Sequence, residues 1–218
     1  MGKRRLDDAI KQIDHPIEVT YRCYELDPNK ERGIDLNMYE SLSKKYGMSI
    51  AQAKASTQNI VQMAKESGLE YNFDTLILTN TFDAHRLAMF AKSHGLMAEM
   101  TERLLRAYFT DSKDIGDHET LVDLAGEVGL NREAVEKMLA SNEMAEEVRA
   151  DESTAQQYGI TGVPFFLINK KYAITGAQST ETIVQTLKKV IAESEITILN
   201  NDDGMICDDD GCEIPKKN

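Results

Sequence analysis

The chain has 218 residues, 41% of them hydrophobic, which is enough for one substantial core or for one domain with an insert. Its formal net charge is -12, which excludes nucleic acids and anionic membrane surfaces as expected partners, because both select basic patches. Its apolar runs stay well short of the ~20 residues that cross a bilayer, so we expect no membrane association.

The N-terminus and the cysteine content predict a cytoplasmic protein. Residues 1–6 are basic, but Asp7 and Asp8 follow where a secretory signal would continue into an apolar stretch. The chain has 3 cysteines, too few for a disulfide scaffold. In a reducing compartment, we expect any disulfide to be functional rather than structural.

Two elements are predicted near the N-terminus. Apolar residues fall on one face of a short helix over residues 4–13, which Pro16 ends. Residues 17–23 then alternate between apolar and polar side chains, which predicts a β-strand that closes at a turn around Pro28.

Residues 36–155 have the apolar periodicity of helices almost throughout. The clearest stripes run through Ala84, Leu87, Ala88 and Ala91; Met97, Met100, Leu104, Ala107 and Tyr108; Leu121, Leu124 and Val128; and Val135, Met138 and Leu139. Residues 71–78 interrupt this pattern and predict an extended connector. We therefore expect an all-helical block.

The pattern changes again after Val163. Two apolar segments, 165–168 and 172–174, are separated by a connection short enough to predict an antiparallel hairpin. A final amphipathic helix is expected from Thr180, and residues 201–218 form an acidic segment without periodicity.

Residues 159–168, Gly-Ile-Thr-Gly-Val-Pro-Phe-Phe-Leu-Ile, resemble the cis-proline loop of thioredoxin-fold oxidoreductases. Most X-Pro bonds in folded proteins are trans, so it is the resemblance that predicts a cis bond between Val163 and Pro164. In such proteins this loop lies beside the active-site sulfur and pairs with an extended substrate. The resemblance therefore implies substrate binding at Val163 and Pro164.

Three further segments resemble the FrnE type of DsbA-like proteins: residues 172–178, 80–87 and 104–117. The resemblance implies an α/β, thioredoxin-like fold with an inserted all-helical domain. We expect residues 1–35 and 156–200 to form a discontinuous thioredoxin-like domain, with the helical insert at 36–155. The remaining residues, 201–218, would be a tail that carries a Cys-x4-Cys pair.

One departure from the family pattern concerns the N-terminus. In DsbA-like proteins of this type, an apolar strand and a Cys-Pro-(aromatic)-Cys-Tyr segment precede a helix start similar to Gly-Lys-Arg-Arg, which here occupies residues 2–5. We therefore expect the first central strand and both catalytic cysteines to be missing, since they would lie before Met1. The missing strand would lie between residues 17–23 and 165–168, and its absence leaves backbone groups unpaired on both.

The three cysteines differ in their expected roles. Cys207 and Cys212 resemble the second cysteine pair of FrnE-type proteins and are our candidates for an auxiliary redox pair, the alternative being chance placement. The aspartates between them disfavour a thiolate, so the pair suits the relay of a disulfide better than the first attack. Cys23 is expected to be a small buried apolar residue, with a redox role as the alternative.

Other sites receive less support. The acidic run around Cys207 lacks the spacing of an EF-hand, and two cysteines without a nearby histidine form half of a zinc site at most, so no metal is expected. His85 is expected to be an ordinary helix residue, although the resemblance places its segment near the active-site side and keeps it as a candidate for substrate binding.

The predicted function is that of a thiol–disulfide oxidoreductase or isomerase, inactive or impaired in this form. Its partners would be thiol- or disulfide-containing proteins or small thiols, and the sequence allows an oligomer. No cofactor is expected, with glutathione as the alternative redox partner. One alternative is a glutathione-dependent isomerase or transferase of the 2-hydroxychromene-2-carboxylate isomerase kind, and another is a non-catalytic peptide-binding or chaperone-like module. A cysteine pair before Met1 would favour the first function, and a serine there the second.

Overall fold

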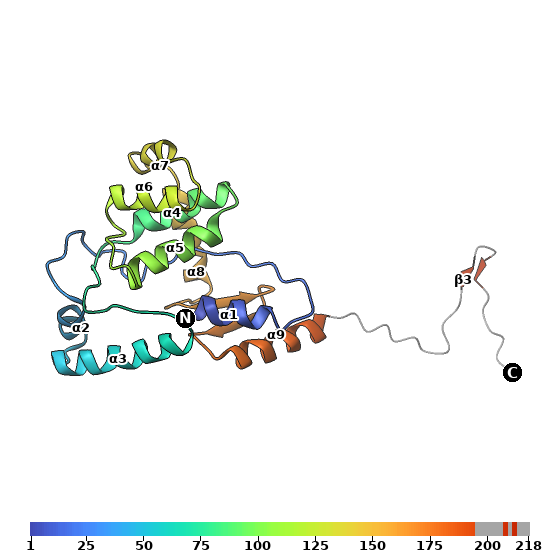
Figure 1. Cartoon of the computed structure of the whole chain (residues 1–218). Helices are drawn as coiled ribbons and strands as arrows, with labels where there is room; N and C mark the ends of the chain where they lie inside the picture. Colours follow the sequence, from blue (N-terminus) through green and yellow to red (C-terminus); the bar gives the residue numbers. More distant parts are fainter. Residues whose placement is uncertain (195–206, 209–210, 213–218) are drawn as a thin grey trace.

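The computed structural model describes residues 1–194, 207–208 and 211–212 (Figure 1). The helices are α1 (Gly2–Ile10), α2 (Met38–Tyr46), α3 (Ile50–Glu66), α4 (Phe82–Ser93), α5 (Met97–Phe109), α6 (His118–Glu127), α7 (Arg132–Leu139), α8 (Ala145–Gln157) and α9 (Thr180–Ser194). The strands are β1 (Phe165–Ile168), β2 (Tyr172–Thr175), β3 (Cys207–Asp208) and β4 (Gly211–Cys212).

One core joins the two ends of the main body. The strands β1 and β2 form an antiparallel hairpin, as predicted, and Asn169 and Lys170 both take positive φ at its turn. The helices α1 and α9 lie side by side against this hairpin (Figure 1). Ala9 and Ile183 are fully buried between these elements, so residues from both ends of the chain share one apolar core.

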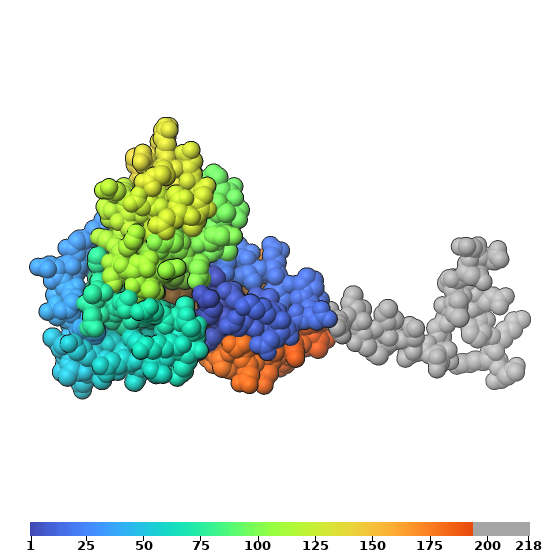
Figure 2. All heavy atoms as spheres, viewed as in Figure 1, coloured from blue at the N-terminus to red at the C-terminus, as the bar shows by residue number. Residues whose placement is uncertain are grey.

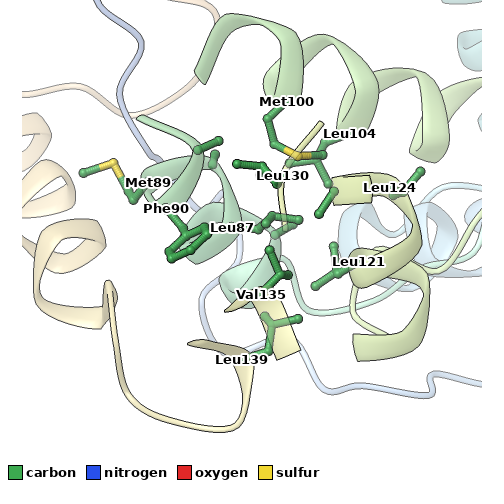
Figure 3. Packing of buried hydrophobic residues seen from close by; sticks show 14 of the residues in the cluster. Leu87, Met89, Phe90, Met100, Leu104, Leu121, Leu124, Leu130, Val135 and Leu139 are labelled. Atoms are coloured by element: carbon green, nitrogen blue, oxygen red, sulfur yellow. The ribbon is translucent and has the colours of Figure 1, made fainter. Parts of the chain in front are cut away.

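A second, larger core lies in the block formed by α4 to α8. The predicted stripes face inward, and the side chains of Leu87, Met100, Leu121, Leu124 and Val135 are fully buried there (Figure 3). In the space-filling view this block rises above the α1 and α9 part and above α3 (Figure 2). The apolar stripes that the sequence predicted are therefore the buried faces of these helices.

The helices α2 and α3 form a hairpin with well-defined ends. Asn37 and Ser49 each begin a helix with a capping box, in which the side chain accepts backbone N–H groups and the residue three positions later caps in return. Gly47 ends α2 at a φ of 65°, a conformation that glycine adopts without strain. This hairpin packs on the connector through Phe73 and Leu76.

The segment 17–23 was wrongly predicted to be a strand. It makes no backbone–backbone hydrogen bond with any described residue, because the hairpin β1–β2 does not pair with it. Its side chains still contribute to the two apolar cores, since Ile17 packs on the α1–α9 core and Cys23 lies in the helical core. The alternating pattern therefore reflects the packing of Ile17, Tyr21 and Cys23 on the two cores, while Val19 is exposed, and not a ladder of hydrogen bonds.

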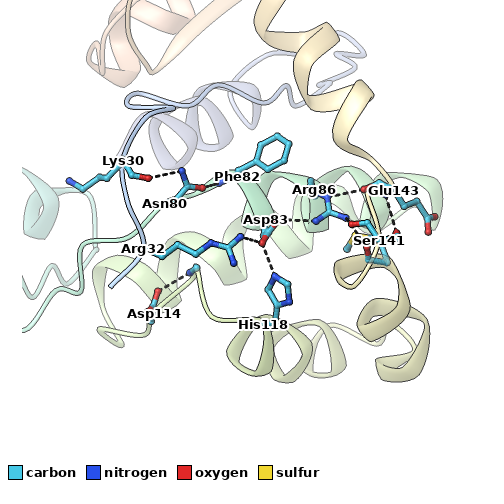
Figure 4. Close-up of polar contacts among 12 residues, drawn as sticks. Lys30, Arg32, Asn80, Phe82, Asp83, Arg86, Asp114, His118, Ser141 and Glu143 are labelled. Carbon is cyan, nitrogen blue, oxygen red and sulfur yellow. Dashed lines mark hydrogen bonds and ion pairs between the residues drawn. The ribbon is translucent and has the colours of Figure 1, made fainter. Parts of the chain in front are cut away.

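A buried polar cluster holds the helical block to the loop before α2. Asp83 on α4 accepts hydrogen bonds from Arg86, from Arg32 of that loop and from His118 on α6 (Figure 4). Arg86 in turn donates to the backbone carbonyls of Met138, Ser141 and Glu143. Asp83 and Arg86 therefore connect α4 to the loop before α2, to α6, to α7 and to the loop that follows α7.

None of the helices described is long and apolar enough to cross a membrane. Within the residues that the structure describes, no group of three or more histidine, cysteine, aspartate or glutamate side chains is arranged to hold a metal ion.

Candidate functional site

The first turn of α1 packs directly on Pro164. Gly2 is buried there, and a Cβ atom on it would come within 2.8 Å of the Pro164 Cβ and 3.4 Å of the Phe166 ring. The peptide bond between Val163 and Pro164 is cis, as the resemblance predicted. Val163 remains about half exposed beside this contact. The predicted substrate-binding loop therefore lies at the N-terminal end of a helix.

Several cations surround this end of α1. Lys3 lies 3.0 Å and Arg4 2.8 Å from the carboxylate of Glu102 on α5. Although partial burial lowers the pKa of Lys3, its hydrogen bonds to Asp7 and Glu102 outweigh that effect and raise it. Arg5 donates to the carbonyl oxygen of Ala177, which follows the hairpin. Lys3 and Arg4 thus connect the start of α1 to α5, and Arg5 connects it to the loop between β2 and α9.

Tyr71 of the connector completes the site. The Met1 ammonium donates a hydrogen bond to the Tyr71 hydroxyl at 3.1 Å. Partial burial and the positive charge of Arg5 lower the pKa of this ammonium group. The Tyr71 ring stacks on Phe109 at the end of α5, with the ring centroids 4.6 Å apart. The connector, through Tyr71, and the end of α5, through Phe109, therefore lie next to the start of α1.

The arrangement suits a negatively charged group. The N-terminus of a helix carries a partial positive charge and unpaired N–H groups, and Lys3 and Arg4 lie beside it with part of their charge balanced by Glu102. A thiolate at such a position is stabilised, which lowers the pKa of the thiol and makes it reactive at neutral pH. This geometry can therefore stabilise a thiolate held beside Pro164.

Cys23 lies away from this site, in the helical core. It is 2% exposed, its backbone N–H donates to Asp151 at 2.8 Å, and its thiol points to the carbonyl oxygen of His85. Burial, followed by the charge of Asp151, raises the pKa of the Cys23 thiol to about 12. The expectation of a small buried residue is therefore confirmed, and this thiol is unsuited to attack.

His85 lies with Cys23 and not with Pro164. It is partly buried on α4 against the backbone of Tyr24, and burial is the main reason why its pKa is lowered. Among the described residues, no hydrogen bond or ion pair connects it to Val163 or Pro164. The structure therefore does not bring this candidate together with the cis-proline loop.

Cys207 and Cys212 are opposite each other in the backbone register of a short ladder. The strands β3 and β4 pair antiparallel, with Cys207 opposite Cys212 and Asp208 opposite Gly211. The Cα atoms of directly opposed residues in such a ladder lie ~4.5–5.5 Å apart, which falls within the range spanned by disulfides. The backbone register is therefore compatible with a bridge between the two cysteines.

The sequence did not indicate two residues of the site, Tyr71 and Glu102. Glu102 comes from a stretch predicted to be helical and Tyr71 from the connector predicted at residues 71–78, and both are far from Gly2 and Pro164 in the chain. Neither belongs to a motif, and only the packing of the insert brings them to the start of α1.

This architecture is that of a thioredoxin-like fold with a helical insert, and the helix start beside the cis-proline loop places it in the DsbA-like class. Residues 1–188 match the family described as DSBA-like thioredoxin domain, and the chain belongs to this family.

Similar proteins include the crystal structure titled "probable DsbA oxidoreductase SCO1869" from Streptomyces coelicolor. It is 38% identical and superposes with a TM-score of 0.84 over 99% of this chain and 93% of that chain. The "Cytosolic disulfide reductase DsbM" from Pseudomonas aeruginosa, solved with GSH, is 14% identical, with a TM-score of 0.60 over 88% of this chain and 92% of the other, which shows the shared fold. The "Uncharacterized protein YwbO" of Bacillus subtilis is 29% identical over 170 residues, which are 77% of this chain and 79% of YwbO.

Proposed function

We propose that this site, once completed by a Cys-x-x-Cys segment before Met1, carries out thiol–disulfide exchange with thiol- or disulfide-containing proteins or small thiols, and that the 218-residue form is inactive or impaired. The observation that carries the proposal is the contact between the cation-flanked N-terminus of α1 and Pro164, with Val163 exposed beside it. A thiolate at the helix end attacks one sulfur of a disulfide, so that one S–S bond forms as the other breaks. The leaving sulfur departs as a thiolate, and a second thiol resolves the mixed disulfide, which passes two electrons from the dithiol to the disulfide.

The expected pair before Met1 and the three cysteines of the chain differ in their proposed roles. The reacting pair would be a Cys-x-x-Cys before Met1, where the resemblance expects it. Cys207 and Cys212 would serve as an auxiliary pair that accepts or relays the disulfide, with glutathione as a redox partner in the cytoplasm. Cys23 takes no part, because its thiol is buried and its pKa is raised.

The experiment compares two forms of the protein in an insulin-reduction assay. One is the 218-residue chain. The other carries an added apolar strand and a Cys-Pro-x-Cys segment before Met1. We expect negligible turnover by the first form and clear turnover by the second, together with a higher melting temperature, because the added strand would pair with backbone that has no partner in the sheet described. A third form, with serines in place of the added cysteines, controls for the effect of the extra strand on stability.

The same assay can contradict the proposal. If the 218-residue form reduces insulin as fast as the extended form, the α1–Pro164 site is not the primary one, and Cys207 and Cys212 must carry the reaction. If the serine form instead shows glutathione-dependent isomerase or transferase activity, the alternative enzyme class is favoured.

A further inference from the structure

A cavity of about 830 Å³ opens between α3 and the connector that follows it. This volume is within the usual range of ligand-binding sites. The cavity is distinct from the α1–Pro164 contact but shares Tyr71 with it. The α3 wall consists of Lys54, Thr57, Gln58, Val61, Gln62 and Lys65, and the opposite wall of Tyr39 and residues 71–75.

The cavity has an excess of positive charge, although the chain as a whole is acidic. Lys54 and Lys65 both line it, and within residues 1–194 neither forms an ion pair with a carboxylate. Lys54 lies over the Tyr39 ring at 5.2 Å. The acidic residue of the lining, Asp74, already accepts a hydrogen bond from the Tyr39 hydroxyl at 2.8 Å. Two cations are therefore available to a ligand that carries carboxylates.

The remaining lining suits a peptide. Gln58 and Gln62 present amide groups, which can donate to and accept from peptide groups. Val61 and Phe73 add apolar surface. Tyr71 lines the cavity, and its hydroxyl accepts a hydrogen bond from the Met1 ammonium, so the cavity and the start of α1 share this residue.

We propose that this cavity binds an acidic peptide segment of the thiol or disulfide substrate, with its carboxylates at Lys54 and Lys65. The identity of the ligand as a redox substrate rests on the proposed function, whereas the binding of an acidic peptide does not. In this arrangement the cavity selects substrates by charge, and the α1–Pro164 site carries out the exchange.

The experiment measures equilibrium binding to the full-length chain by fluorescence anisotropy. The probe is a short fluorescein-labelled peptide rich in glutamate, and a second probe has every glutamate replaced by glutamine. We expect the glutamate peptide to bind more tightly, with an affinity that falls as salt is added. The double variant K54Q/K65Q should weaken its binding about ten-fold, as the loss of two partly exposed charge contacts implies.

A matched variant removes the same charge elsewhere. Lys44 and Lys45 are exposed at the end of α2 and do not line the cavity, so K44Q/K45Q should leave binding close to that of the wild type. Equal binding of the two probes, or equal losses in the two double variants, would overturn the proposal.

A third variant examines the competing occupant, the acidic C-terminal segment of the chain itself. If D208N/D209N/D210N binds the glutamate peptide several-fold more tightly, that segment occupies the cavity and the proposal fails. Unchanged affinity supports an external peptide. Because no step measures turnover, a negative result here is distinguishable from a failure of the proposed exchange reaction.

Discussion

Asp83 and Arg86 form an ion pair one helical turn apart on α4, with Oδ1 and Nη1 separated by 2.8 Å. Both side chains are almost completely buried, being 4% and 5% exposed. A buried charge without a partner is costly, so each residue requires the other. The pair also fixes the loop before α2 through Arg32 and the start of α6 through His118. It therefore holds together the block that positions Glu102 and Tyr71.

Replacing Asp83 by asparagine should strongly destabilise the protein. The guanidinium of Arg86 would remain buried without a countercharge, and breaking such a pair costs about 3–5 kcal/mol. The free energy of unfolding, measured by urea denaturation, gives this value directly. The matched control is D123N, because the pair of Asp123 with Arg132 is about half exposed and should contribute less than about 1 kcal/mol. Equal losses in the two variants would contradict the role assigned to Asp83.

The stability that Asp83 contributes should depend on pH in the acidic range. Burial alone would raise the pKa of Asp83, but the hydrogen bonds from His118 and Arg86 and the charge of Arg32 lower it below the ordinary value of 3.8. A carboxyl with a lowered pKa contributes stability that is fully present above its unfolded value and is lost as the pH falls through its folded value. We therefore expect the stability gap between wild type and D83N to be constant above about pH 4 and to shrink below it. Urea titrations over a series of pH values measure the gap, and a gap that grows on acidification would reverse the assignment.

The sequence predicted the parts of the fold that depend on local periodicity and turn chemistry. The stripe through Leu87 on α4 marks a buried face, and the short connection after Ile168 marks a hairpin. It did not predict that residues 17–23 lack a strand partner, because pairing depends on residues elsewhere. The resemblance identified Val163 and Pro164, but Tyr71 and Glu102 carry no local signal and become visible only once the insert packs on α1.

Replacing Gly2 by alanine should disturb the candidate site. The new methyl group would stand 2.6 Å from the Pro164 Cγ, so the helix start or the loop has to shift. Overpacking of this kind costs about 1–3 kcal/mol, and a thermal melt should show a lower melting temperature. The control is G162A, since a Cβ atom at Gly162 meets nothing within 4 Å. That variant should equal or slightly exceed the stability of the wild type. A G2A melt that coincides with the wild type would mean that the contact is not tight.

Cys23 should resist alkylation in the folded protein. With the pKa of its thiol raised to about 12 by burial and by Asp151, the thiolate fraction at pH 8 is on the order of one part in ten thousand. Treatment with iodoacetamide, followed by peptide mass spectrometry, should find Cys23 unmodified in buffer and modified in concentrated urea. Rapid modification of Cys23 under native conditions would show that the segment opens or that the thiol is not buried.

Cys207 and Cys212 should form a reversible disulfide and show little thiolate character when reduced. The register of β3 and β4 sets the two residues opposite each other, at a Cα separation that a disulfide can span. Asp208, Asp209 and Asp210 stand between them in sequence, and neighbouring carboxylates raise the pKa of a thiol. Thiol titration of the reduced protein should therefore place both pKa values at or above the ordinary ~8.5, and D208N/D209N/D210N should lower them. A pKa well below that value in the wild type would show that the pair is built for first attack rather than for relay.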